Sequence, residues 1–347
     1  MIPAKGIATH GPKEALRPFS FERRNPRDHD VVIDIQYCGI CHSDIHQARD
    51  EWGGSQFPMV PGHEIAGVVR AVGAQVTRHQ VGDPVGIGCF VDSCRTCENC
   101  KQSLDQYCLE GNTVTYNGYE RDGTTPTYGG YSNTIVVDEN YVLKIPETIP
   151  LDQAAPLLCA GITLFSPLKH WRAGPGKRVG VMGLGGLGHM GVKIGAAMGA
   201  EMTVLSHSDA KRVDAFRMGA HQFVSSSNPD HLKKYKNYFD LIINTVSAEI
   251  PLNDYLELLK LDGSMVAVGV PEKSFSIHPF PLIMLRRSYS GSLIGSIAET
   301  QEMLHFCAKH QALPEVEVIS PHQVNQAYER VLKRDVRYRF VMDMTQL

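Results

Sequence analysis

The stretch Val179-Gly-Val-Met-Gly183-Leu-Gly185-Gly-Leu-Gly188 decides the fold of the second half of the chain. It places the pattern G-x-G-x-x-G directly after a predicted strand and at the start of an amphipathic helix. In that context Gly183 makes a tight turn, Gly185 lets the backbone approach a pyrophosphate, and Gly188 allows the helix to pack on the strand. Free N–H groups at the helix start would face phosphate oxygens. The stretch therefore predicts a dinucleotide site on an α/β sheet.

Short apolar strands alternate with helical stretches around this motif, from about residue 156 to residue 292. We expect strands at residues 178–182, 202–205, 241–245 and 265–270, with helices between them. Alternation of this kind is typical of a doubly wound parallel sheet that helices cover on both faces. Residues 156–292 are therefore predicted to form a Rossmann domain.

The flanking segments, residues 1–155 and 293–347, have a different texture. In the first, β-branched runs such as 31–37 and 65–72 are broken by Gly, Pro and Asp, which predicts an irregular, mostly antiparallel β domain. The tail carries two helical stretches and an alternating strand at 337–342, and we expect it to return to this first domain. For 347 residues, two domains with separate cores are the natural expectation.

The composition argues against several classes of partner. The net charge is −3 and Lys and Arg are scattered along the chain, so we expect neither a nucleic-acid stripe nor a polybasic membrane patch. We see no apolar run near the roughly 20 residues that span a bilayer, and the start of the chain lacks the features of a signal peptide. We expect a cytoplasmic protein that acts on a small molecule.

Four close-set cysteines follow the spacing C-x2-C-x2-C-x7-C: Cys94, Cys97, Cys100 and Cys108. Thiols that converge on one point fit tetrahedral zinc, and four thiolates leave no open coordination position, so such a site stabilises structure. Two disulfides are the alternative. An odd total of nine cysteines and the lack of a secretory leader favour zinc.

A sparser set of metal-ligand types lies outside this quartet, at Cys41, His63 and Cys159. Two thiolates and one imidazole are the ligands of a catalytic zinc whose fourth position is left to water or substrate. Their spacing alone does not group them. The remaining cysteines are expected in the core: Cys38, Cys89 and Cys307.

The end of the second Rossmann strand selects between the two nicotinamide cofactors, because an acid there binds the ribose of NAD and repels a 2′-phosphate. Here the strand ends in Ser206-His207-Ser208, followed by Asp209, Lys211 and Arg212. Hydroxyls and cations suit a phosphate, which predicts NADP. The alternative is an ordinary polar turn in which Ser208 caps the next helix.

The segments around these residues resemble the zinc-containing alcohol dehydrogenases of the medium-chain dehydrogenase/reductase superfamily. The similarity covers the whole chain and is closest to the cinnamyl alcohol dehydrogenase branch and its broad-range NADPH aldehyde reductases. The matching segments include Cys41-His-Ser-Asp-Ile-His46, Pro61-Gly-His-Glu64 and the stretches 155–161, 183–191, 291–295, 299–303 and 335–341. The resemblance implies a GroES-like, mostly β catalytic domain joined to a Rossmann NADP-binding domain.

The resemblance also implies roles for individual residues. Cys41, His63 and Cys159 fall on the catalytic-zinc positions and the quartet on the structural-zinc positions, which makes two zinc ions per chain. Asp44 falls on the carboxylate that orients the ligand histidine. Two further site residues are implied, an acid near the metal at Glu64 and a serine at Ser43 that bonds the substrate oxygen. From Ser43 the proton would pass through the nicotinamide ribose to His46.

Further implied cofactor contacts are Ser206, Ser208 and Lys211 at the 2′-phosphate, with His207 replacing a serine of the plant enzymes. The remaining expected cofactor contacts are Gly186, Leu187 and Ile294. Trp52 is a candidate wall of the substrate pocket. The implied reaction is hydride transfer between NADPH and an aldehyde carbonyl polarised by zinc, with broad specificity, in a homodimer. The alternatives are an NAD-dependent polyol dehydrogenase and a cofactor-binding relative without catalysis.

Overall fold

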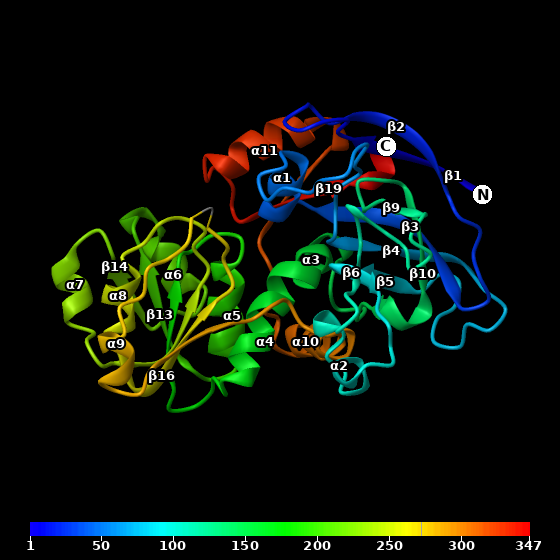
Figure 1. Cartoon of the computed structure of the whole chain (residues 1–347). Helices are drawn as coiled ribbons and strands as arrows, with labels where there is room; N and C mark the ends of the chain where they lie inside the picture. Colours follow the sequence, from blue (N-terminus) through cyan, green and yellow to red (C-terminus); the bar gives the residue numbers. More distant parts are fainter. Residues whose placement is uncertain (272) are drawn as a thin grey trace. The chain divides into compact units, whose positions relative to one another are not determined.

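The computed structural model describes residues 1–271 and 273–347, and the chain, whose elements are labelled in Figure 1, divides into two compact units. Unit 1 contains Met1–Cys159, Gly295–Lys309 and Leu313–Leu347, whereas unit 2 contains Ala160–Ile294 and His310–Ala312. The sequence-based boundaries lie at 155/156 and 292/293, a few residues before the main divisions. The short contribution of His310–Ala312 to unit 2 was not predicted.

Unit 1 is built on a seven-stranded sheet. Its strands are β3 (Asp30–Gly39), β4 (Ile65–Val72), β5 (Pro84–Ile87), β10 (Thr134–Asp138), β11 (Leu143–Lys144), β18 (Val316–Ile319) and β19 (Arg339–Asp343). The order is β11-β5-β4-β3-β19-β18, and β10 also pairs with β3. Most neighbours are antiparallel, as predicted, while β18 and β19 run parallel. Because β19 pairs with β3, the C-terminal tail returns to the first unit, which the sequence also predicted.

Shorter elements surround this sheet. They are β1 (Ile2–Ala8), β2 (Arg17–Arg23), α1 (His42–Ala48), β6 (Phe90–Asp92), α2 (Glu98–Lys101), η1 (Asp105–Tyr107), β7 (Thr113–Val114), β8 (Gly118–Tyr119), β9 (Pro126–Thr127), η2 (Glu139–Tyr141), α3 (Leu151–Pro156), α10 (Ile297–His310), η5 (Pro321–Gln323), α11 (Val324–Leu332) and η6 (Met344–Gln346). The hairpin of β1 and β2 was not predicted, and its exposed second strand carries little hydrophobic signal.

The helical stretch Leu151–His170 corrects one expectation, because it is long and apolar enough by length and composition to cross a membrane. It runs through α3, a π-helical turn at Leu157–Gly161 and α4 (Ile162–His170). However, 78% of it is buried inside the fold, so it is a core helix. The π turn contains Cys159, and such turns often re-aim a side chain at a functional site.

Unit 2 is a sheet of six parallel strands in the order β14-β13-β12-β15-β16-β17. The strands are β12 (Arg178–Met182), β13 (Glu201–Ser206), β14 (Gln222–Ser225), β15 (Phe239–Asn244), β16 (Leu259–Ala267) and β17 (Ser288–Gly291). The other elements are α4, α5 (Gly188–Ala197), η4 (Asp209–Lys211), α6 (Arg212–Arg217), α7 (Pro229–Lys233), α8 (Leu252–Leu256) and α9 (Phe280–Ile283). This is the predicted doubly wound sheet.

The strand order of unit 2 reverses between β12 and β15, and ligands of such sheets bind outside the carboxyl ends of the strands at that point. The glycine-rich turn follows β12 directly. The edge strand β14 was not predicted, because a four-residue run gives too little periodicity to identify. Phe239, Ile242 and Met265 are fully buried and form part of the core.

Candidate metal centres and cofactor site

The cysteine quartet lies in the loops and the short helix between β6 and β7. The four sulfur atoms lie within 4.8 Å of one another, and Cys94 Sγ is 3.9 Å from Cys100 Sγ. Two sulfurs on a tetrahedral zinc stand about 3.8 Å apart, given zinc–sulfur bonds of about 2.3 Å. All nine cysteines belong to the described residues, and none forms a disulfide. The arrangement fits zinc and does not support the disulfide alternative.

Backbone N–H groups point at the sulfurs of the quartet. Cys97 N–H donates to Cys94 Sγ at 3.3 Å, and the N–H groups of Cys100 and Leu109 donate to Cys97 Sγ at 3.5 Å. The bond from Cys97 N–H lowers the pKa of Cys94 to about 6, because a hydrogen bond to the charged form favours it. These donors prepare thiolates, the form that binds metal.

A second cluster brings together Cys41, His63, Glu64 and Cys159, all buried, with one ligand atom of each within 4.8 Å of the others. Cys41 Sγ and Cys159 Sγ are 3.8 Å apart, and His63 Nε2 is 3.3 Å from Cys159 Sγ. The sulfur separation again matches tetrahedral zinc. The thiol–thiol hydrogen bond lowers the pKa of Cys41 and raises that of Cys159.

Asp44 holds the imidazole of this cluster in place. Its Oδ1 is 3.2 Å from His63 Nδ1, which leaves Nε2 facing the sulfurs. The carboxylate is fully buried and also accepts the N–H groups of Cys41 at 2.8 Å and Gly62 at 3.1 Å. Burial is the largest single effect and opposes protonation of His63, but the charge and hydrogen bond of Asp44 together with the thiols of Cys89 and Cys41 raise the pKa of His63 well above its usual value. Asp44 therefore contacts His63 on the side of the ring that faces away from the sulfurs.

Glu64 is the acid of this cluster and is fully buried. Its Oε1 forms an ion pair with the guanidinium of Arg339, while its Oε2 is buried without a hydrogen-bond partner among the described residues. An unsatisfied buried carboxylate oxygen next to two thiols and an imidazole fits a site built for a cation. Gly39 makes room for this side chain, because a Cβ there would lie 2.0 Å from Oε2.

Ser43 and His46 project from α1 beside this cluster. Ser43 Oγ is 3.6 Å from Cys41 Sγ. His46 Nδ1 is 2.5 Å from Glu51 Oε2, and its ring stacks on the indole of Trp52 with centroids 4.8 Å apart. Trp52 is 42% exposed, so it covers His46 and is not a packed core residue.

The glycine-rich loop has the predicted geometry. Gly183 has φ +85°, as a tight turn after β12 requires. A Cβ at Gly185 would meet nothing within 4 Å, whereas a Cβ at Gly188 would lie 2.0 Å from the carbonyl oxygen of Gly183. Gly186 and Leu187 complete the loop before α5 begins. Ile294 follows β17, which β15 and β16 separate from β12 in the sheet, so it does not adjoin the glycine-rich loop, and its contact with the cofactor stays a prediction.

The end of β13 lies beside this loop, since Lys211 Nζ donates to the carbonyl oxygen of Leu184 at 2.6 Å. Ser206 is buried, while His207 and Ser208 are exposed. Ser208 precedes a 3-10 turn but makes no capping hydrogen bond with its side chain, which removes the alternative of a simple helix cap. Asp209, the nearest acid, pairs with Arg212 at 2.8 Å and accepts a hydrogen bond from the Ser225 hydroxyl at 3.1 Å.

Comparison with known proteins agrees with this arrangement. Residues 27–147 match the alcohol dehydrogenase GroES-like domain, and residues 186–309 match the zinc-binding dehydrogenase family. The chain is 58% identical over 334 residues to NADP-dependent alcohol dehydrogenase C of Mycobacterium tuberculosis, covering 96% of each chain. It belongs to the zinc-binding alcohol dehydrogenase family.

Two further relatives refine this placement. Aldehyde reductase YahK of Escherichia coli is 51% identical, with 98% of this chain and 97% of that protein covered. The crystal structure of a cinnamyl alcohol dehydrogenase, SbCAD4 from Sorghum bicolor, is 44% identical, with a TM-score of 0.96 and coverage of 99% of this chain and 98% of that one. The fold predicted from the sequence is therefore confirmed.

Several residues of this dehydrogenase's metal site were not predicted as site residues. Cys89 was expected in the core, but it is only partly buried: its thiol donates to the carbonyl oxygen of Leu158 at 3.9 Å, and the neighbouring thiol of Cys159 lowers the pKa of Cys89. Arg339 and Glu51 were not singled out as partners of Glu64 and His46. An arginine 275 residues from its acid gives no local signal, and an acid five residues after a histidine matches no helical spacing.

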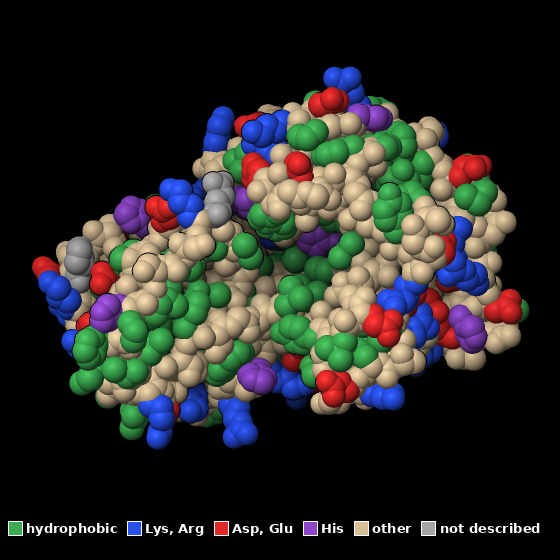
Figure 2. Space-filling view, viewed as in Figure 1, with side chains coloured by type: hydrophobic (Ala, Val, Ile, Leu, Met, Phe, Trp, Pro, Cys, Tyr) green, Lys and Arg blue, Asp and Glu red, His purple; other side chains and the backbone are tan. Residues whose placement is uncertain are grey.

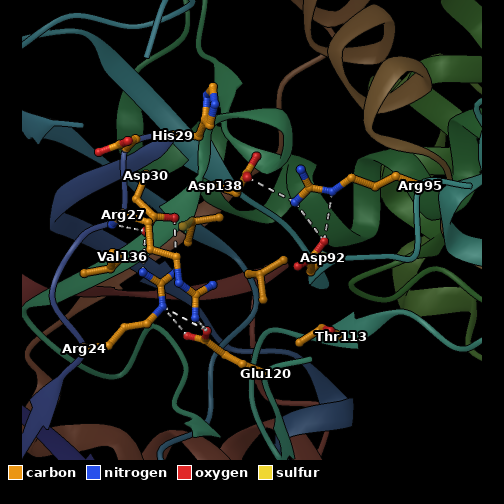
Figure 3. Close-up of a pocket in the computed structure, with 13 residues that line it drawn as sticks. Arg24, Arg27, His29, Asp30, Asp92, Arg95, Thr113, Glu120, Val136 and Asp138 are labelled. Carbon is orange, nitrogen blue, oxygen red and sulfur yellow. Dashed lines mark hydrogen bonds and ion pairs between the residues drawn. The ribbon is translucent and has the colours of Figure 1, made fainter. Parts of the chain in front are cut away.

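A separate cavity of about 480 Å³ opens in unit 1 among charged side chains (Figure 3). Arg24 bridges Asp30 and Glu120, and Arg95 bridges Asp92 and Asp138. Each of these two guanidinium groups and four carboxylates already has an ion-pair partner, so none of them is left unpaired for a ligand. We assign the cavity no function.

Proposed function

We propose that this chain is an NADP-dependent, zinc-dependent alcohol dehydrogenase that interconverts primary alcohols and aldehydes and acts in the cell as an aldehyde reductase. The observation that carries the proposal is the buried cluster of Cys41, His63 and Cys159, with Glu64 beside it, in a chain that also has the glycine-rich loop. The names of the relatives support the same activity, and SbCAD4 supports aromatic and cinnamyl aldehydes among its substrates.

The two clusters would bind two zinc ions with different roles. Zinc at Cys41, His63 and Cys159 would polarise an aldehyde oxygen, and NADPH would supply the hydride. Three protein ligands would leave one position of the metal for that oxygen, with Glu64 beside it: one oxygen of Glu64 is paired with Arg339, and the other is unpartnered among the described residues. The quartet is closed by its own four sulfurs, so its role is structural.

The proton for the alcohol product would come through Ser43 and His46. Ser43 lies next to Cys41, where its hydroxyl can bond the substrate oxygen. Glu51 fixes the orientation of the His46 ring through Nδ1, and Trp52 covers the face of that ring. A histidine on a part-exposed helix face is suited to exchange protons with solvent.

The cofactor preference follows from the end of β13. Ser206, Ser208 and Lys211 offer two hydroxyls and one ammonium group where a 2′-phosphate would lie, with His207 exposed beside them. An NAD-dependent polyol dehydrogenase would need a free acid here, but Asp209 is engaged by Arg212 and Ser225. A relative without catalysis would have lost ligands, whereas here both ligand sets are complete.

Surface features support the expected partners. On the visible face, basic and acidic side chains are interspersed, which favours a small-molecule substrate over nucleic acid or a charged membrane (Figure 2). The edge strand β17 is accompanied by exposed Phe280, Ile283 and Met284, a surface suited to a second copy of the chain. We therefore propose a homodimer, which light scattering would test. Nine unpaired cysteines suit the reducing cytoplasm.

The deciding experiment measures initial rates of cinnamaldehyde and benzaldehyde reduction with NADPH and with NADH, on protein whose zinc content has been counted. We expect fast oxidation of NADPH, slow oxidation of NADH and about two zinc ions per chain. No turnover with either cofactor by protein that carries both zinc ions would contradict the proposed activity.

A further inference from the structure

The carboxylate of Asp44 lies within a layer of three buried tyrosines that the sequence analysis did not single out. Tyr131 is fully buried, and its hydroxyl donates to Asp44 Oδ2 at 3.3 Å. Tyr328 donates to the hydroxyl of Tyr131 at 3.4 Å. Tyr116 stacks on the ring of His63, with centroids 5.8 Å apart and an interplanar angle of 14°. The ligand imidazole and its carboxylate are thus enclosed by phenols.

These phenols stay protonated. Burial, and after it the negative charge of Asp44, raise the pKa of Tyr116, Tyr131 and Tyr328 well above the ordinary value. A neutral phenol beside a buried carboxylate is a donor, and a hydrogen bond to a charged acceptor is stronger than one between neutral groups. A series of hydrogen bonds therefore runs from Tyr328 through Tyr131 to Asp44, and Asp44 contacts the ring of His63.

Tyr131 is itself held by backbone contacts to the loop that carries His63. Gly129 N–H donates to Val60 O at 2.7 Å, and Tyr131 N–H donates to Pro61 O at 2.9 Å. Glycine is required for this approach, since a Cβ at Gly129 would lie 2.3 Å from Pro61 O. The segment and the ligand loop therefore form one rigid piece of backbone.

Arg23 fixes the far side of this segment. Its guanidinium is buried and donates to the carbonyl oxygens of Tyr128 at 2.6 Å, Gly129 at 3.1 Å and Thr134 at 3.0 Å. These hydrogen bonds to the backbone of residues 128–134 leave Tyr131 little freedom to move away from Asp44.

We propose that Tyr131 is a positioning residue of the catalytic metal site, whose hydroxyl holds Asp44 in the orientation that presents His63 Nε2 to the metal. The proposal rests on the proposed function of Cys41, His63 and Cys159 as ligands. Outer partners of a ligand histidine commonly change metal affinity by about 10–100-fold. Tyr131 is one hydrogen bond further from the metal than Asp44 is. We therefore expect its hydroxyl to slow the release of the metal by about tenfold, the lower end of that range.

The test measures zinc release from the holoprotein to excess chelator, followed with a chromogenic zinc indicator, for Tyr131→Phe and for Tyr328→Phe. Tyr328→Phe is the matched control, because it removes a hydroxyl of the same buried layer that bonds Tyr131 and not Asp44. A Cys159→Ser variant identifies which release phase belongs to the catalytic site. We expect about tenfold faster release of that phase in Tyr131→Phe alone, and a shifted visible spectrum when cobalt replaces zinc.

Equal release rates in wild type and Tyr131→Phe, or equal acceleration in Tyr328→Phe, would overturn the positioning role. If the wild type holds a single zinc that Cys159→Ser retains, the proposed catalytic site itself fails, which is a separate result. Should Tyr131→Phe not fold, 3-fluorotyrosine at position 131 gives a more acidic donor and a stronger bond to Asp44. Release must then be slower than in wild type, and an unchanged rate would count against the proposal.

Discussion

Two glycines of the cofactor loop should respond oppositely to the same substitution. In Gly188→Ala the new Cβ would lie 2.0 Å from Gly183 O, so the backbone must move by about 1.4 Å to reach the 3.4 Å of ordinary contact. Overpacking of this kind costs about 1–3 kcal/mol, or roughly 2–12 °C in Tm for a domain of this size. In Gly185→Ala the Cβ meets nothing within 4 Å, so Tm should stay within about 2 °C of the wild type.

For cofactor binding we expect the opposite order, with the larger loss of NADPH affinity in Gly185→Ala. The open space at Gly185 is where a pyrophosphate would approach the backbone, and losing one charge-assisted hydrogen bond there costs at least about 1.4 kcal/mol, or tenfold in Kd. Circular dichroism measures Tm, and enhancement of NADPH fluorescence measures Kd. If Gly185→Ala binds NADPH as tightly as wild type, the space is not a phosphate site. If Gly188→Ala has the same Tm as the wild type, the close approach of residue 188 to the carbonyl oxygen of Gly183 does not limit the stability of the fold.

Three further predictions follow from single contacts. Ser208→Asp should move the preference from NADPH toward NADH by at least about tenfold in the ratio of kcat/KM, because a carboxylate repels the 2′-phosphate; an unchanged ratio argues against that phosphate site. Arg339→Met leaves the charge of Glu64 buried and unpaired, which should cost about 3–5 kcal/mol in urea unfolding at neutral pH; a loss under about 1 kcal/mol would contradict the ion pair's role. His79 is buried with both ring nitrogens unpartnered among the described residues, and burial, followed by the charge of Lys144, lowers the pKa of His79. The neutral ring therefore contributes fully to the free energy of unfolding above the ordinary histidine pKa of about 6.5, and this contribution is lost as the pH falls through the lowered pKa. His79→Leu should reduce the loss of stability toward acid pH in urea unfolding, and curves of stability against pH that run parallel for the two proteins would refute this.

The glycine-rich turn and the cysteine quartet could be predicted from the sequence, because each depends on residues that are close together along the chain. The turn at Gly183, the strand before it and the helix after it are decided within ten residues, because glycine adopts the positive φ at Gly183 without strain and a Cβ at Gly188 would collide with the carbonyl oxygen of Gly183. The cysteine quartet spans 15 residues, so its four sulfurs must lie near one another in any compact fold. These features belong to the sequence alone.

The proposed catalytic cluster of Cys41, His63 and Cys159 could not be assembled without the tertiary structure. Cys41 and Cys159 are 118 residues apart, and nothing in their spacing groups them; the pairing of strands in unit 1 and the π turn at Cys159 bring their sulfurs to 3.8 Å. The resemblance to a known family supplied these ligands, but it identified neither Tyr131 behind Asp44 nor Cys89 beside Cys159. A hydrogen bond between residues 87 positions apart has no signature in sequence, because only the packed sheet fixes the distance between their side chains.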